Sequence, residues 1–258
     1  MTIYEMLVYL SSIIIMIKIG LTQPFNVVKS AYHNMLEIET QNIKLKKTSN
    51  RALEVLSSTT GILSNLYGLE HGIFEILQGN TTPDSPIIDA IGPANEFFPG
   101  AMEPAFTIIP NFLITGIIAV ILGAIGIIWS IAFIRKKYGG LGMFIISILL
   151  LLMGGGSAPV FLGLVSSLLA SKINKPLNWW NTHLSTKSKK FLGKLWPWSI
   201  IITVSYSLFS VELAIFGWPL IYLLDLEVFY VILYIAGNIG TLLMVISIIS
   251  GVGYDLKN

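Results

Sequence analysis

The residues of this sequence that could do chemistry lie on one stripe of the apolar segment 52–78. Small and polar side chains recur there at alternating intervals of three and four, which is the spacing of one helix face. The stripe consists of Glu54, Ser57, Gly61, Ser64, Gly68, His71, Glu75 and Gln78. We therefore predict a helix that turns this stripe toward other protein and away from lipid.

His71 and Glu75 are the pair on this stripe with the clearest chemical meaning. They are four residues apart, so their side chains should face each other on the helix. Because histidine titrates near neutral pH and carboxylates bind cations, the pair predicts a proton relay or a cation site. The alternative is a hydrogen-bonded pair that only fixes helix packing. Glu70 lies about 100° round the helix from His71, so it needs a partner elsewhere.

A glycine-rich break at residues 154–159 interrupts the apolar block 141–171. Its sequence, GGGSAP, should end a helix, because glycine is flexible and proline lacks a backbone donor. Non-helical backbone persists inside a membrane only where protein or a water-filled cavity covers it. We therefore predict that the break lines a cavity inside a helix bundle. The candidate residues are Gly154, Gly155, Gly156, Ser157 and Pro159.

Three further chemical interpretations stay open. Glu212 lies inside a later apolar run, where it could pair with a polar group of another span or mark the outer interface. Ser157 with His71 as its base would suggest a membrane-embedded hydrolase, but such a nucleophile also needs an oxyanion hole and an oriented base. One histidine and a few carboxylates leave a metal site undecided, and no cofactor is implied.

The composition indicates a membrane protein. Of the 258 residues, 54% are hydrophobic and 12% are charged, whereas soluble domains carry about 25% charged residues. The mean hydropathy is +0.76. The absence of cysteine excludes disulfides and thiolate metal sites, and clusters of basic residues between apolar runs are typical of cytoplasmic loops rather than of a nucleic-acid surface. We predict an all-α, polytopic transmembrane helix bundle in the plasma membrane, with the lipid bilayer as its partner.

The predicted spans are the apolar runs of the sequence. They lie at residues 3–21, 52–78, 106–134, 141–171, 198–216 and 228–252. As one helix, block 141–171 would be about 46 Å long, too long for an untilted crossing of a hydrocarbon core of about 30 Å. The block should therefore go in and come back, either as a re-entrant hairpin or as two short spans. The bundle then has five to seven spans.

The domain organisation and orientation follow from these runs. Residues 1–51 should form an N-terminal span, expected to stay uncleaved, and a polar cytoplasmic segment. Residues 52–258 should form the bundle, with an outer loop at 79–104 that carries no Lys or Arg. Because basic loops stay in the cytoplasm, we expect the N-terminus outside and the C-terminus inside.

Small residues also recur along the run 106–134. Gly116, Ala119, Gly123, Gly126 and Ser130 should let this helix pack closely and antiparallel against the helix of residues 52–78. Near the middle of the last run, Asn238 should form a hydrogen bond between helices.

Three stretches carry a family resemblance. They are GLEHGIFEILQGN at 68–80, EPAFTIIPN at 103–111 and GGGSAP at 154–159. From about residue 52 onward the chain resembles an uncharacterised family of prokaryotic multi-span membrane proteins. The resemblance implies a multi-span membrane fold and implies no activity.

The function that these features favour is a transporter or a channel-like protein for a small solute or cation. The alternative is a non-catalytic membrane subunit or scaffold, in a homo- or hetero-oligomer. A membrane-embedded enzyme that uses His71, Glu70, Glu75 or Ser157 is the second alternative, and the sequence favours it less.

Overall fold

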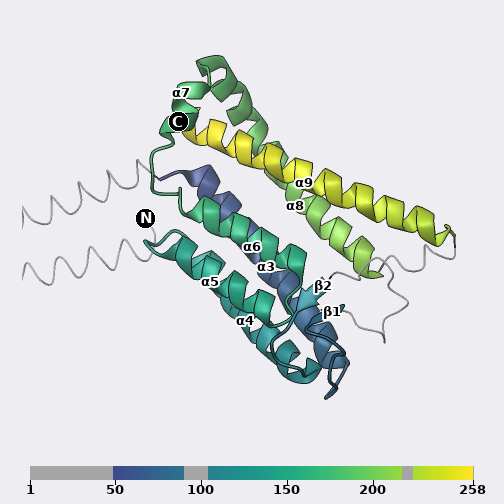
Figure 1. Ribbon diagram of the computed structural model, residues 1–258. Coiled ribbons are helices and arrows are strands. Elements are labelled where there is room, and N and C mark those ends of the chain that lie inside the picture. The colour runs from purple at the N-terminus through teal and green to yellow at the C-terminus, as the bar shows by residue number, and fades with distance from the viewer. Residues whose placement is uncertain (1–48, 90–103, 217–222, 258) are drawn as a thin grey trace, which may run out of the picture. The chain divides into compact units, whose positions relative to one another are not determined.

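Helices make up most of the computed structural model, which describes residues 49–89, 104–216 and 223–257 (Figure 1). The described helices are α3 (Arg51–Leu77), α4 (Phe112–Ala132), α5 (Gly139–Leu152), α6 (Ser157–Ala170), α7 (Asn178–His183), α8 (Thr186–Phe216) and α9 (Leu226–Lys257). The predicted helical class is therefore confirmed. The predicted span at 3–21 and the polar segment up to residue 48 lie outside the described residues.

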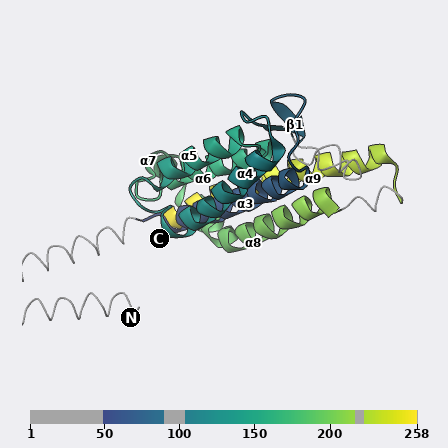
Figure 2. The ribbon, with the colours of Figure 1, turned by 90° about the horizontal axis from the view of Figure 1, so that it is seen from below.

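Helix α3 is the element against which most others pack. It contacts α4, α6 and α9 extensively and α8 more weakly, whereas α8 packs mainly on α9. Figures 1 and 2 show α3 running between the α4–α6 group and the α8–α9 pair. The predicted polar stripe thus belongs to the helix with the most protein neighbours.

Close approach of α3 and α4 depends on glycine. A Cβ on Gly72 would lie 2.8 Å from the carbonyl oxygen of Gly116, and a Cβ on Gly116 would lie 2.6 Å from that of Gly72. Farther along, Gly123 lies against the backbone of Asn65. Because higher numbers on α4 meet lower numbers on α3, the helices are antiparallel, and the predicted packing through small residues is confirmed.

Helices α3 and α6 are joined by serine hydroxyls. Ser57 donates to the carbonyl oxygen of Ser166 at 2.7 Å, and Ser166 donates in return to the carbonyl of Ser57 at 2.6 Å. Ser64 donates to the carbonyl of Pro159 at 2.6 Å. The interior of this part of the fold is therefore polar and close-packed at once.

The predicted break divides block 141–171 into two helices. Helices α5 and α6 have 14 residues each, or about 21 Å at 1.5 Å per residue, and they pack on each other. The break itself is thus confirmed. Whether the pair crosses a membrane twice or re-enters it stays a prediction.

The outer loop contains an element that the sequence did not predict. Strands β1 (Ile87–Asp89) and β2 (Pro104–Phe106) pair antiparallel, with Ile88 opposite Ala105. The predicted helix start at residue 106 is wrong, because the chain stays extended there and α4 begins at Phe112. Asn111 caps this helix by accepting the backbone N–H of Ile114 at 3.0 Å, a role for which asparagine is well suited.

The predicted basic loop before residue 198 is also largely helical. Helix α7 occupies Asn178–His183, and α8 starts at Thr186 and contains Pro197. The Ser185 hydroxyl accepts the backbone N–H of Ser188 at 3.1 Å, which caps α8. The predicted run began at residue 198 because hydropathy marks only the apolar part of a helix, and the first residues of α8 are polar and basic. Pro197 lies inside the helix, where a proline can be accommodated at the cost of one backbone hydrogen bond.

The helix ends that carry Lys and Arg come together, and we call this region the basic end. The main chain of Asn50 donates to Ile173 at 2.7 Å, and the Asn174 amide donates to the carbonyl of Arg135 at 3.0 Å. Asp255, at the end of α9, accepts the backbone N–H groups of Ala52 and Leu53 at 2.8 and 3.1 Å. One carboxylate thus caps α3 and ties it to α9.

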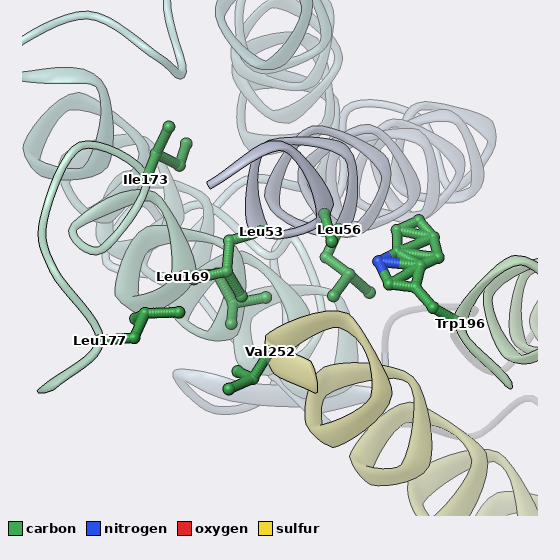
Figure 3. Close-up of a cluster of buried hydrophobic side chains, with 8 residues drawn as sticks. Leu53, Leu56, Leu169, Ile173, Leu177, Trp196 and Val252 are labelled. Carbon is green, nitrogen blue, oxygen red and sulfur yellow. The ribbon is translucent and has the colours of Figure 1, made fainter. Parts of the chain in front are cut away.

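A buried apolar cluster fills the basic end. Figure 3 shows its side chains converging from α3, α6, α8, α9 and the turn after α6. The labelled members are Leu53, Leu56, Leu169, Ile173, Leu177, Trp196 and Val252. This cluster holds the α8–α9 pair to the rest of the fold.

Large apolar side chains also cover the outside of α4. The exposed isoleucines of α4 expose 44–66% of their surface, and they are Ile114, Ile117, Ile121, Ile125, Ile128 and Ile131. Among the described residues, two helices are long and apolar enough to cross a membrane, Phe112–Ala132 and Glu227–Lys257. Helices α5 and α6 are apolar but shorter, and the predicted spans in α3 and α8 are not among the two.

Candidate functional site

The last third of α3 carries three of the predicted site residues. Glu75 is fully buried, with 0% of its surface exposed, whereas Glu70 and His71 are partly buried. His71 and Glu75 lie one helical turn apart, on the same face. That face is directed toward the connection between α5 and α6.

The connection between α5 and α6 depends on glycine at two positions. Gly154 and Gly156 both have φ of +78°, a conformation that costs other L-residues roughly 1–2 kcal/mol. The Gly154 N–H donates to the carbonyl of Phe106 at 2.8 Å, and the N–H of Ile108 donates to the carbonyl of Leu152 at 3.1 Å. The break is therefore held by the segment that follows β2.

The break and the polar stripe of α3 are in contact. A Cβ on Gly154 would overlap the Glu75 carboxyl group, and a Cβ on Gly156 would lie 2.6 Å from Nε2 of His71. Both side chains thus lie directly on glycine backbone. The structure brings these four residues together, although their chemical role stays a prediction.

The Glu75 carboxyl group lacks a hydrogen-bond partner among the described residues. The Thr115 hydroxyl lies beside it but donates to the carbonyl oxygens of Asn111 and Phe112 in its own helix. Burying an ionised carboxylate without a partner costs several kcal/mol or more. A proton or a cation at this carboxyl would remove that cost.

Asn65 is a buried polar residue whose position the sequence argument did not explain. It is 0% exposed, and its amide donates to the Gly61 carbonyl at 2.7 Å, while its Oδ1 has no partner among the described residues. It lies against Gly126 of α4. The signal was that Asn65 and Gly72 widen the predicted stripe of α3, because they lie four residues after Gly61 and Gly68.

The remaining predicted site residues have different surroundings. Gly155 is buried near Gly68, and Pro159 is buried and accepts from Ser64. Ser157 begins α6 with an exposed side chain. The backbone of Glu212 lies in α8, but its side chain lies outside the described set.

The predicted hydrogen bond between helices at Asn238 is wrong. Its side chain is exposed and donates at 2.8 Å to the Tyr234 carbonyl of its own helix. The nearby Gly237 has no atom within 4 Å of an added Cβ, whereas the adjacent Ala236 accepts a hydrogen bond from the Tyr206 hydroxyl of α8 at 3.0 Å.

No group of three or more His, Cys, Asp or Glu side chains that could hold a metal occurs among the residues that the structure describes. The candidate site therefore consists of a buried carboxyl group, a neighbouring imidazole and glycine backbone. No family model matches this chain, and comparison with curated proteins and with solved structures finds no significant match.

Proposed function

We propose that this chain is a multi-span membrane protein, of five to seven spans, that moves a small solute or cation through a transporter-like or channel-like bundle. Glu75 is the group that takes up the proton or cation, and His71 lies one turn away as its neighbour. The observation that carries the proposal is the fully buried Glu75 carboxyl without a hydrogen-bond partner among the described residues, in contact with the broken backbone at Gly154.

The distribution of polarity supports the membrane part of the proposal. Six of the described serines have 0% exposure, and they are Ser57, Ser64, Ser130, Ser147, Ser166 and Ser250. Large aliphatic side chains instead face outward along α4. Small and hydroxyl-bearing residues between helices, with apolar residues outside, are typical of helix packing in lipid. In water so extensive an apolar surface would favour association.

The distribution of charge supports the orientation. Apart from Lys194, which lies two turns into α8, every Lys and Arg of the described residues lies at or near a helix end that belongs to the basic end. The opposite ends carry acids, among them Asp84 and Asp225, and no basic residue in the described segments. With the positive-inside rule, this pattern agrees with a cytoplasmic C-terminus.

Flux through proteoliposomes tests the proposal. The purified chain is reconstituted, and uptake of H⁺, Na⁺ and K⁺ is followed under an imposed gradient. Glu75→Gln keeps the shape of the side chain but cannot ionise. Flux should therefore fall at least about tenfold, which corresponds to about 1.4 kcal/mol of free energy. The matched control is Glu227→Gln, which neutralises an exposed acid in the first turn of α9.

Two results would overturn parts of this assignment. Wild-type flux in Glu75→Gln, with the protein folded, would remove Glu75 from the transport path. Equal losses in Glu75→Gln and Glu227→Gln would show a general charge effect rather than a site. A wild-type chain that moves none of the three ions would contradict the cation function and favour the scaffold.

The scaffold alternative receives less support from packing. The scaffold was proposed because glycine-lined helix faces could bind a partner protein. These glycines instead contact neighbouring helices of the same chain, and they include Gly61, Gly72, Gly116 and Gly123. Those faces are therefore already used within the molecule. The enzyme alternative would use His71, Glu70, Glu75 or Ser157. Of these, Ser157 has an exposed side chain, whereas Glu75 is buried.

A further inference from the structure

A basic and aromatic face runs along the first half of α8. Lys187, Lys190 and Lys194 are exposed and spaced by three and four residues, so they lie on one side of the helix. Phe191 and Trp198, each 67% exposed, continue the same side. We call these five residues the α8 face.

The α8 face is held in place by a helix cap, by hydrogen bonds to α7 and by the apolar cluster of the basic end. Ser185 caps the helix, and Lys189 donates from Nζ to the backbone carbonyl and to Oδ1 of Asn181 in α7, at 2.9 and 2.6 Å. Leu177, just before α7, is buried in the apolar cluster of the basic end. The lysines of the face therefore project from a fixed helix rather than from a loose loop.

Among the residues that the structure describes, few acidic groups compete for these lysines. Residues 157–211 contain no Asp or Glu. At the basic end, Asp255 accepts from the backbone of α3, and Glu54 lies 3.8 Å from Arg135. The positive charge of the α8 face is therefore left for a partner of opposite sign.

The order of side chains along the face matches the layers of a membrane surface. From Lys194 to Trp198 the helix rises about 6 Å, and from Lys187 to Trp198 about 16 Å. Beyond Trp198 the exposed residues are aliphatic, beginning with Ile201 and Ile202. Tryptophan prefers the interface between headgroups and hydrocarbon, and long lysine side chains reach outward to the headgroups.

We propose that the α8 face binds the headgroups of anionic phospholipids at the cytoplasmic surface of the membrane. Clusters of four or more basic residues next to a membrane helix attract anionic lipid, at about 1 kcal/mol per residue. Three lysines of one face, with Lys189 beside them on the same helix, meet that description. The inference rests on the membrane placement of the proposed function but not on its ion transport.

Native mass spectrometry of the intact purified chain tests the proposal. The chain is titrated with phosphatidylglycerol, with phosphatidylcholine and with inorganic phosphate. The triple variant Lys187→Gln, Lys190→Gln, Lys194→Gln should weaken phosphatidylglycerol binding roughly 100-fold, if each lysine contributes about a fivefold factor. The corresponding Lys→Arg variant should keep the affinity of the wild type.

The matched control removes three other exposed lysines of the basic end, Lys136, Lys137 and Lys172. It should change the affinity for phosphatidylglycerol less than about threefold, because exposed charges at a distance are screened. Equal losses in both variants would overturn the proposal in favour of a diffuse charge effect. Equal binding of both lipids, binding of phosphate alone, or tighter binding of an added DNA oligonucleotide would also overturn it.

This result is independent of the flux assay. Loss of lipid selectivity with normal ion flux would support the α8 face and leave the role of Glu75 to its own test. Normal lipid binding with lost flux in Glu75→Gln would support the role of Glu75 and would not bear on the α8 face.

Discussion

Replacing Gly154 with alanine should destabilise the protein by about 2–5 kcal/mol. Roughly 1–2 kcal/mol comes from placing a side chain at φ of +78°. A further 1–3 kcal/mol, approximately, comes from overpacking, because the new Cβ would overlap the Glu75 carboxyl. That carboxyl is fully buried, so it cannot turn into solvent to make room.

Two glycine controls separate the conformational cost from the cost of overpacking. Gly79 has φ of +76°, but an added Cβ meets no atom within 4 Å, so Gly79→Ala should cost only the conformational part, about 1–2 kcal/mol. Gly237 has neither a positive φ nor a nearby atom. Gly237→Ala should therefore stabilise α9 slightly, by about 0.5–1 kcal/mol.

The free energy of unfolding is measured by denaturant titration of each purified variant, in the same detergent. A double-mutant cycle with Glu75→Ala then tests the contact itself. The double variant should cost about 1–3 kcal/mol less than the sum of the single changes, since removing the carboxyl relieves the overlap. If Gly154→Ala cost no more than Gly79→Ala, Glu75 would not lie on Gly154, and the geometry of the candidate site would be wrong.

Three other substitutions probe separate parts of the fold by the same unfolding measurement. Gly72→Ala should cost about 2–3 kcal/mol, because its Cβ would press on the α4 backbone at 2.8 Å; a neutral effect would refute the close α3–α4 contact. Asp255→Asn should cost about 1 kcal/mol, since an amide keeps only one of the two oxygens that accept the backbone N–H groups of α3; unchanged stability would mean that the carboxylate does not cap it. Asn238→Ala should be within about 0.5 kcal/mol of the wild type, because the amide is exposed and bonded within its own helix; a large loss would restore the predicted bond between helices.

The sequence predicted the parts of the fold that depend on helical spacing. The small residues of α4, from Gly116 to Ser130, were assigned to the α3 contact because intervals of three and four residues define a helix face. The break after α5 was predicted because consecutive glycines followed by proline rarely continue a helix. Local composition decides both features, so one sequence is enough to recognise them.

The features that the sequence missed depend on contacts between distant residues. Strand β1 pairs with β2, although residues 90–103 separate the two in the sequence, and a three-residue strand has too little pattern of its own to be recognised. The cap that Asp255 provides joins residues 203 and 202 positions apart, and neither helix signals it alone. The start of α8 was missed because its first residues are polar and basic, so hydropathy marks only the part of the helix from residue 198 onward.

The candidate site was likewise predicted from the sequence only in part. Spacing predicted that His71 and Glu75 share a face, and the structure adds that this face contacts Gly154 and Gly156. The spacing could not reveal that Glu75 has no hydrogen-bond partner among the described residues, since that depends on how Thr115 uses its proton. The chemical interest of Glu75 therefore comes from packing rather than from a motif.

Infrared difference spectroscopy tests the central claim, that Glu75 exchanges a proton or cation, most directly. The C=O stretch of protonated carboxyl groups is recorded for the reconstituted chain and for Glu75→Gln, first while pH is stepped and then while Na⁺ or K⁺ is added. We expect a carboxyl band that responds to pH or to cation in the wild type and is missing from the variant. Identical difference spectra for the two proteins would contradict the claim.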